Sequence, residues 1–202
     1  MTVTTTQVTN QALLKLGSDT IASLSEDTKP ARICNAIFVL LRDEMLRQHP
    51  WNFAMARSEL VADVADAPDF EFTYQYALPD DYIRLIGLYN DRTRFKIEGG
   101  YILTDSDTVD IIYIQQMEDP TEWDPLFREA FATRLASEIA LALTGSNTVA
   151  QALMFDYGIK LGKAKSVDAQ ENYSDGFIVD DLISSRLTGS PNGPTWPFDT
   201  GL

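Results

Sequence analysis

The sequence has few of the residue types that form most catalytic and metal sites. Its 202 residues include one cysteine, Cys34, and one histidine, His49. A disulfide within the chain is therefore excluded, as is a zinc site with four cysteine and histidine ligands from one chain. A Ser–His–Asp arrangement would depend on His49, the residue before a helix-breaking proline, and we do not expect one. Cys34 shares a helical stripe with apolar residues, so we predict a core residue rather than a nucleophile.

Basic residues and long apolar runs are also scarce. Lysine and arginine number 16 against 30 aspartate and glutamate residues, which gives a net charge of −14. Proteins that grip phosphate backbones normally carry the opposite charge, so we expect no specific binding of DNA. No run of about 18 apolar residues is present, and we expect no membrane span. The first residues lack the pattern of a secretory signal, and no glycine loop suited to phosphates occurs, so we expect no cofactor.

Helical periodicity is present at both ends of the chain. Apolar residues recur every three to four positions in four segments, which predict helices over residues 6–16, 29–48, 125–143 and 148–170. In the second helix the predicted buried stripe consists of Cys34, Ile37, Phe38, Leu41 and Met45, and Arg42 is placed on the opposite side. Asp27 or Thr28 is expected to cap this helix, and Asp124 the third. Gly158 and Gly162, one turn apart, are either merely tolerated or allow a neighbouring helix to approach closely.

The middle of the chain has a period of two instead. Strands are predicted over residues 74–78, 82–90, 95–98, 101–104 and 109–116, with 59–66 as either a strand or a short helix. Gly99 and Gly100 predict a tight hairpin. We expect one small antiparallel sheet of three to five strands. The predicted fold is therefore α+β: a bundle of about four helices (residues 1–53 and 119–171), an inserted β-rich subdomain (54–118) and an extended C-terminal tail (172–202).

The junction of helix and sheet is the segment 40–54, LLRDEMLRQHPWNFA. Pro50 cannot donate the next helical hydrogen bond and pushes His49 away from helical dihedrals, so the helix must end here. Two large rings, Trp51 and Phe53, follow at once. If the chain is extended they share a side and can pin the sheet to the bundle. We therefore predict a structural joint at Pro50, Trp51 and Phe53.

The tail is unusually apolar for a segment with three prolines and several glycines. Purely disordered tails are poor in large apolar residues, so we predict that this one becomes ordered on a partner; the alternative is that it folds back over its own domain. The predicted docking residues are Tyr173, Phe177, Ile178, Leu182, Ile183, Leu187, Trp196 and Phe198.

Two charged groups each have a structural interpretation and a functional alternative. Three lysines in the last helix are expected on a solvated face, with contact to DNA or to an acidic neighbouring subunit as the alternative; they are Lys160, Lys163 and Lys165. A second group could supply carboxylates to a calcium loop and comprises Asp105, Ser106, Asp107 and Asp110. It lacks the glycine and the distal glutamate of an EF-hand, so we expect a solvated hairpin end.

A third charged group precedes the third predicted helix and consists of Glu118, Asp119, Glu122 and Asp124. Acidic residues at this position are favoured by the helix dipole, which is our first interpretation. The alternative is a pair of carboxylates acting as acid and base on a glycan, with Glu118 and Glu122 as the residues to test.

Three blocks of sequence together resemble the tail tubular protein A family, the head-to-tail adaptors of short-tailed (podovirus-type) bacteriophages. The blocks are residues 46–54 (LRQHPWNFA), residues 74–84 (YQYALPDDYIR), and a stretch from DPLF at 124–127 through LTGS at 143–146. The resemblance covers roughly residues 5–170, and the order and spacing of the blocks carry it.

The resemblance implies a structural virion protein without a cofactor or an active site. It implies a ring of identical subunits, in this family usually a dodecamer, that binds the portal and closes the head after DNA packaging. The ring would form the platform for a tail nozzle protein of the tail tubular protein B type, and for tail fibres, with a channel through which genomic DNA passes without specific binding. The expected location is the head–tail junction of the virion, after assembly in the host cytoplasm. Some adaptors of short-tailed phages are linked to cell-wall hydrolysis, so a tail-associated peptidoglycan hydrolase is the alternative function.

Overall fold

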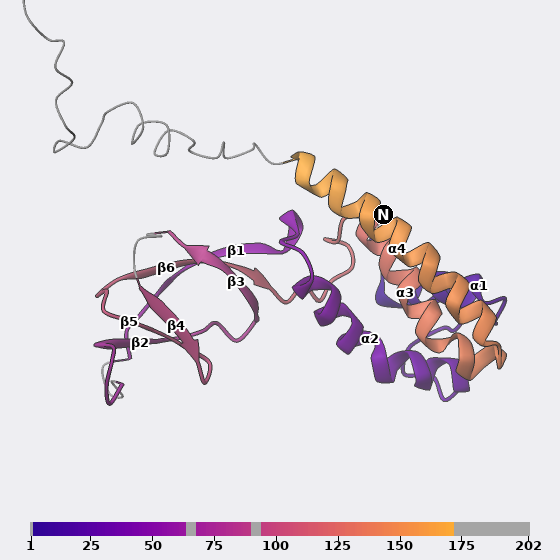
Figure 1. Cartoon of the computed structure of the whole chain (residues 1–202). Helices are drawn as coiled ribbons and strands as arrows, with labels where there is room; N and C mark the ends of the chain where they lie inside the picture. Colours follow the sequence, from indigo (N-terminus) through magenta and orange to yellow (C-terminus); the bar gives the residue numbers. More distant parts are fainter. Residues whose placement is uncertain (1, 64–67, 90–93, 172–202) are drawn as a thin grey trace, which may run out of the picture. The chain divides into compact units, whose positions relative to one another are not determined.

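The computed structural model describes residues 2–63, 68–89 and 94–171. The chain divides into two units, Met1–Gln170 and Glu171–Leu202. The described part of the first unit contains four α-helices and six strands, which confirms the predicted α+β class (Figure 1). The predicted docking residues of the tail lie outside the described residues; they are Tyr173, Phe177, Ile178, Leu182, Ile183, Leu187, Trp196 and Phe198.

The helices begin where local capping signals place them. Helix α1 (Thr5–Lys15) has a capping box between Thr4 and Gln7, and α2 (Lys29–Arg47) is capped by Thr28. Asp124 caps α3 (Pro125–Thr144) by accepting from the backbone N–H groups of Leu126 and Phe127. Gly145 ends α3 with a φ of 69°, a left-handed conformation that suits glycine. Helix α4 (Asn147–Glu171) follows after two residues.

Contacts between the helices fix their directions. Thr121 donates to the carbonyl of Val3, and Lys15 lies on Glu129, so α1 and α3 run the same way. Lys29 at the start of α2 donates to the carbonyl of Ala142 near the end of α3, so these two helices are antiparallel. Helix α4 turns back directly after α3. Helices α2 and α4 therefore run in the same direction, opposite to α1 and α3.

The helical core is aromatic at its centre. The rings of Phe38, Trp123, Phe127 and Phe131 form a contiguous cluster with centroid separations between 4.9 and 6.5 Å. Of the predicted stripe of α2, Cys34, Phe38, Leu41 and Met45 are buried, and Ile37 is half-buried against the same core. The placement of Arg42 on the far side is wrong, because its side chain is only 5% exposed. Asp43 satisfies it at 2.8 Å, which allows a charge to lie beside the stripe.

The inserted strands form two small antiparallel sheets instead of one. The first has the order β1-β6-β3, and the second has the order β2-β5-β4. The strands span Met55–Leu60 (β1), Tyr74–Ala77 (β2), Tyr82–Leu88 (β3), Phe95–Glu98 (β4), Tyr101–Thr104 (β5) and Val109–Gln115 (β6). The predicted hairpin is present, with Gly99 and Gly100 at φ values of 60° and 88°. Residues 105–108 carry the chain from the second sheet to the first. Side chains of both sheets form one core, which consists of Tyr76, Leu88, Ile102, Val109, Ile111 and Tyr113.

Strand β6 connects the sheet core to the helical core. Its residues Val109, Ile111 and Tyr113 point into the sheet core, whereas Ile114 is fully buried in the helical core. Side chains alternate along a strand, so one strand can serve two cores on its two faces. A polar contact adds to this connection, because Gln116 donates to the carboxylate of Asp43 on α2 at 3.0 Å.

Candidate interaction surface

The predicted joint is built into the helical core. Trp51 is fully buried, and its indole N–H donates to the carbonyl of Met45 at 2.9 Å. The rings of Trp51 and Phe53 both pack against Phe127 of α3, with centroid distances of 4.9 and 5.0 Å. Strand β1 begins two residues after Phe53. The two rings therefore anchor the start of the β-rich part to α3.

Asp168, near the end of α4, holds the same joint from the other side. Its carboxylate contacts Nε2 of His49 at 2.9 Å and accepts from the backbone N–H of Asn52 at 3.0 Å. The Asn52 amide donates in turn to the carbonyl of Asp168 at 2.6 Å. Sequence reasoning missed Asp168, because a single aspartate in a helix gives no local sign of a partner more than 100 residues away.

The pairing of His49 with Asp168 has the appearance of two members of a catalytic triad. Here the carboxylate is shared with the backbone of Asn52, and the His49 ring lies edge-on against Trp51 at 4.6 Å. Cys34 is buried in α2, as predicted, and burial raises the pKa of its thiol to about 11. A thiol with that pKa is a poor nucleophile at neutral pH. The geometry of the His49–Asp168 pair is that of a fastening between α4 and the joint.

The acidic residues before α3 have separate local contacts. Asp124 caps the helix, as predicted. Asp119 accepts from the backbone N–H of Thr121 at 2.8 Å, and this hydrogen bond lowers the pKa of its carboxyl. Glu118 has a side chain that is 78% exposed, 4.0 Å from Arg42, and Glu122 is exposed. Each carboxylate thus faces a different partner or solvent, and the geometry assigns none of them a role in catalysis.

The acidic group at 105–110 lies in the link between the two sheets, except for Asp110, which belongs to β6. Asp105 accepts hydrogen bonds from the backbone and hydroxyl of Thr73, and Ser106 donates to the carbonyl of Thr108. The expected solvated hairpin end is therefore a sheet-to-sheet connection, because β5 and β6 belong to different sheets. Among the residues that the structure describes, no group of three or more potential ligands is placed to hold a metal ion.

The three lysines of α4 differ in their surroundings. Lys160 is bound by Asp156 and Glu129, each at 2.7 Å, so it is not part of a free basic patch. Partial burial opposes the charged form of Glu129, but hydrogen bonds from Lys15 and Lys160 outweigh it and hold the pKa of this carboxyl below its ordinary value. Lys163 is exposed and Lys165 is half-buried. Only the latter two fit the expected solvated face.

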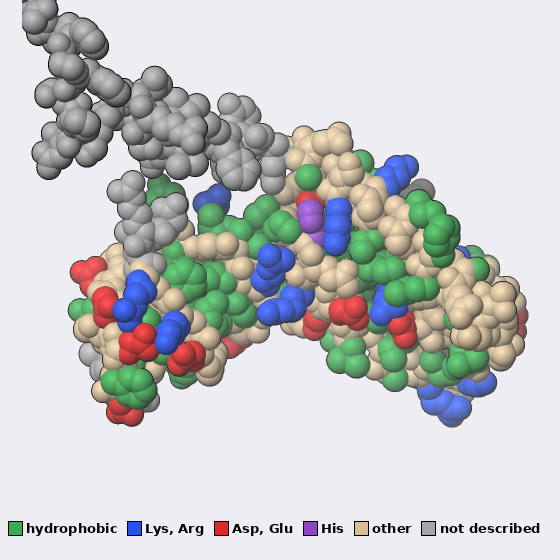
Figure 2. Space-filling view, in the orientation of Figure 1, with side chains coloured by type: hydrophobic (Ala, Val, Ile, Leu, Met, Phe, Trp, Pro, Cys, Tyr) green, Lys and Arg blue, Asp and Glu red, His purple; other side chains and the backbone are tan. Residues whose placement is uncertain are grey.

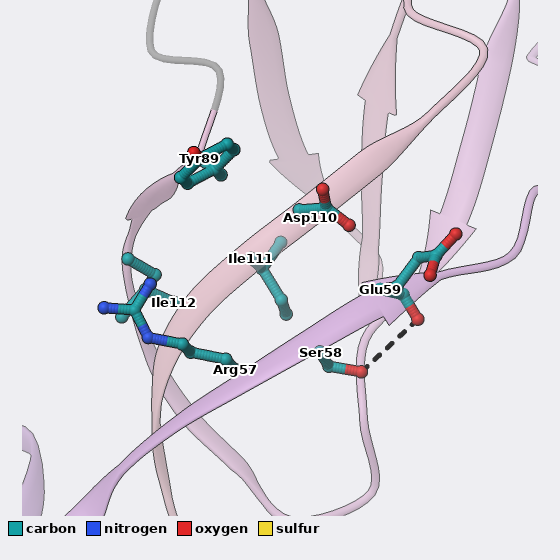
Figure 3. A pocket seen from close by; sticks show the side chains of 7 residues that line it. All are labelled: Arg57, Ser58, Glu59, Tyr89, Asp110, Ile111 and Ile112. Atoms are coloured by element: carbon teal, nitrogen blue, oxygen red, sulfur yellow. Dashed lines mark hydrogen bonds between the residues drawn. The ribbon is translucent and has the colours of Figure 1, made fainter.

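A shallow groove lies on the outer face of the first sheet, with a volume of about 290 Å³. Glu59 of β1 faces Asp110 of β6 directly, and Arg57 lies opposite Ile112 on the same face. Figure 3 shows the two carboxyl groups at one end of the groove, the Arg57 guanidinium at the other and the Tyr89 ring beside them. Like charges directly across a strand pair repel each other. The groove is open, and it separates opposite charges along its length.

Large apolar side chains are exposed on all four helices. Figure 2 shows such side chains at the surface along α4 and α2. On α4, Phe155 is 74% exposed and Ile159 59% exposed; on α2, Leu40 is 69% exposed. Single exposed apolar residues are ordinary, but clusters on neighbouring turns of one helix indicate an interaction surface. We take the outward faces of α4 and α2 as the candidate interaction surface.

No family model matches this chain, and no curated protein matches it. None of the helices in the described ranges is long and apolar enough to cross a membrane.

Proposed function

We propose that this protein is a structural component of a short-tailed bacteriophage virion, a head-to-tail adaptor that forms a ring on the portal. The ring closes the head after DNA packaging and carries the tail nozzle protein and tail fibres. Its site of action is the head–tail junction, reached after assembly in the host cytoplasm. The proposal starts from the three-block resemblance. Those blocks lie at the end of α2 with the joint, at β2 and the start of β3, and in α3.

The observation that supports this function best is the set of exposed apolar side chains on the helices. A protein that acts alone has little reason to keep Phe155, Ile159 and Leu40 in water. A subunit of a ring contacts one copy on each side and needs two different faces, because a ring is closed by head-to-tail contacts. The net charge of −14 agrees with a channel wall past which DNA slides without adhering.

Electron microscopy of the chain mixed with purified portal rings of the same phage tests this function. We expect a second ring of defined symmetry seated on one face of the portal. The symmetry of that ring would give the subunit number, for which a dodecamer is the expectation. A chain that remains monomeric in the presence of portal would refute the proposal.

A peptidoglycan zymogram tests the competing idea of a wall hydrolase. We expect no clearing by the wild-type chain. Clearing that disappears in Glu118→Gln or Glu122→Gln would assign the acidic group before α3 to catalysis and would contradict a purely structural role. Clearing that persists in both variants would point to a contaminating hydrolase or another site.

A further inference from the structure

The outward face of α4 is both apolar and open. Phe155 and Ile159 lie one turn apart on this face and are 74% and 59% exposed. The opposite face of the helix is the packed one, since Tyr157, Ala164 and Asp168 are its buried residues. Phe155 and Ile159 therefore point directly away from the core of their own subunit.

Two glycines continue this face. Glycine in the interior of a helix costs about 1 kcal/mol relative to alanine. At Gly158 and Gly162 an added Cβ would meet no atom within 4 Å, so packing within the subunit does not require glycine at either position. Next to the large side chains of Phe155 and Ile159, the glycines leave room in which another helix can seat a side chain.

The outward face of α2 has the same pattern of residues. Leu40 is 69% exposed and Val39 is 48% exposed, and Ala36 lies exposed one turn before Leu40. One turn after Leu40 the face becomes acidic at Glu44, whose side chain is 49% exposed and lies 3.8 Å from Arg134 of its own subunit. On α4 the turn after Ile159 is basic instead, at the exposed Lys163. The two faces are thus alike in their apolar part and opposite in charge at the same end.

We propose that α4 of one copy of this chain packs in parallel along α2 of a second copy. A constant offset of 119 positions along the two helices brings together three pairs: Phe155 with Ala36, Ile159 with Leu40, and Lys163 with Glu44. In this register a large residue meets a small one, two apolar residues meet each other, and opposite charges meet at the third level.

The direction of the helices agrees with this pairing. Within one subunit α2 and α4 run the same way, because both start beside the end of α3 and both end at the joint. A rotation about an axis roughly along these helices keeps them parallel in the next copy. The contact is head-to-tail, since each subunit offers α4 on one side and α2 on the other, and such contacts build a closed ring or an open filament. The identification of that assembly with a ring on a portal rests on the proposed function.

Paired cysteines test the contact in the full-length chain. The variant Leu40→Cys/Ile159→Cys carries one thiol on each face, so mild oxidation at high protein concentration should give a ladder of covalent multimers. A disulfide requires Cα atoms within about 7 Å, so only this register gives efficient bonding. The native thiol of Cys34 should not interfere, because it is buried and its pKa is raised to about 11. Val61→Cys/Ile159→Cys is the matched control, since Val61 is 86% exposed but lies outside both faces.

The single variants separate the possible arrangements. A mixture of Leu40→Cys and Ile159→Cys chains should give dimers and nothing larger, because each chain then has one reactive face. Dimers formed by Ile159→Cys alone would show that α4 packs on a second α4, and the proposed contact would be wrong. Absence of a ladder from the double variant, or an equal ladder from the Val61 control, would also overturn it.

Charge reversal tests the third level of the register without relying on oxidation. Lys163→Glu should weaken self-association by up to about fivefold, which is the upper end of exposed ion-pair effects. Adding Glu44→Lys should restore it, whereas Lys165→Glu, with the same change in net charge, should leave association near the wild-type value. Glu44→Lys also places a lysine beside Arg134 of its own subunit, so thermal unfolding of each variant is measured alongside. A stably folded double reversal that fails to restore association would refute the Lys163–Glu44 pairing.

The contact and the proposed function can fail separately. A ring that forms on portal without the cysteine ladder would reject only this contact, and a ladder without binding to portal would reject only the adaptor function.

Discussion

Removal of the Asp168 carboxylate should release the end of α4 from the joint. The side chain of Asp168 is 7% exposed and is surrounded by residues of the joint. Its two oxygens are used by different partners, the His49 ring at 2.9 Å and the backbone N–H of Asn52 at 3.0 Å. Asp168→Ala removes both contacts at once, and Asp168→Asn keeps one acceptor oxygen in nearly the same place.

The expected loss of stability follows from these two contacts. A hydrogen bond to a charged group contributes about 1.5 kcal/mol or more to folding. We therefore expect Asp168→Ala to lower the free energy of unfolding by about 3 kcal/mol, and Asp168→Asn by about half of that. Asp156 is the matched control on the same helix. Its side chain is 45% exposed and pairs with Lys160 one turn away, so Asp156→Ala should cost only about 0.5 kcal/mol.

Urea denaturation followed by tryptophan fluorescence is the appropriate assay, because Trp51 is buried beside His49. Circular dichroism on the same samples reports whether the helices unfold in the same transition. If Asp168→Ala costs no more than Asp156→Ala, the fastening between α4 and the joint does not stabilise the protein, and this reasoning is refuted.

Three further predictions concern other parts of the chain. Glu59 repels Asp110 across β1 and β6, so Glu59→Lys should raise the free energy of unfolding in urea by about 0.5 kcal/mol. An unchanged value would show that the repulsion is screened, and a lower value would contradict the prediction. The pKa of Glu129 is held below its ordinary 4.5, so the pairing of Glu129 with Lys15 and Lys160 stabilises the fold above pH 4.5. This stabilisation is lost as the pH falls through the lowered pKa. Glu129→Gln should therefore remove this part of the acid dependence of thermal unfolding. Deletion of residues 172–202 should leave a folded, soluble protein that attaches weakly to portal, whereas an unfolded product would mean that the tail belongs to the core.

Local signals in the sequence predicted the helices and their starts. Thr28 and Asp124 each stand directly before the first residue of a helix, and in the structure both cap that helix. The glycine pair of the β4–β5 hairpin is equally local, because it depends on positive φ at those two positions. Such features depend on neighbours along the chain and are visible in any sequence that contains them.

Contacts between distant segments were not visible in the sequence. Arg42 is buried, and its guanidinium pairs with Asp43 and lies 4.0 Å from Glu118, which belongs to the segment after β6. Asp168 is buried because the joint, formed by a segment far earlier in the chain, supplies its hydrogen bonds. The division into two sheets depends on β5 and β6 pairing with different strands, and their alternation of side chains is the same in either case.

Helix α4 shows why one stripe of apolar residues did not describe the whole helix. Its inner face places Tyr157 and Ala164 in the helical core, and Asp168 and Lys160 add polar contacts to the joint and to Glu129. Apolar residues lie on the other face as well, where Phe155 and Ile159 are exposed. A helix with apolar residues on both sides is normally covered on both sides. The sequence of α4 is therefore better matched to an assembled protein than to an isolated subunit, which is the reason to test its outward face for a second copy.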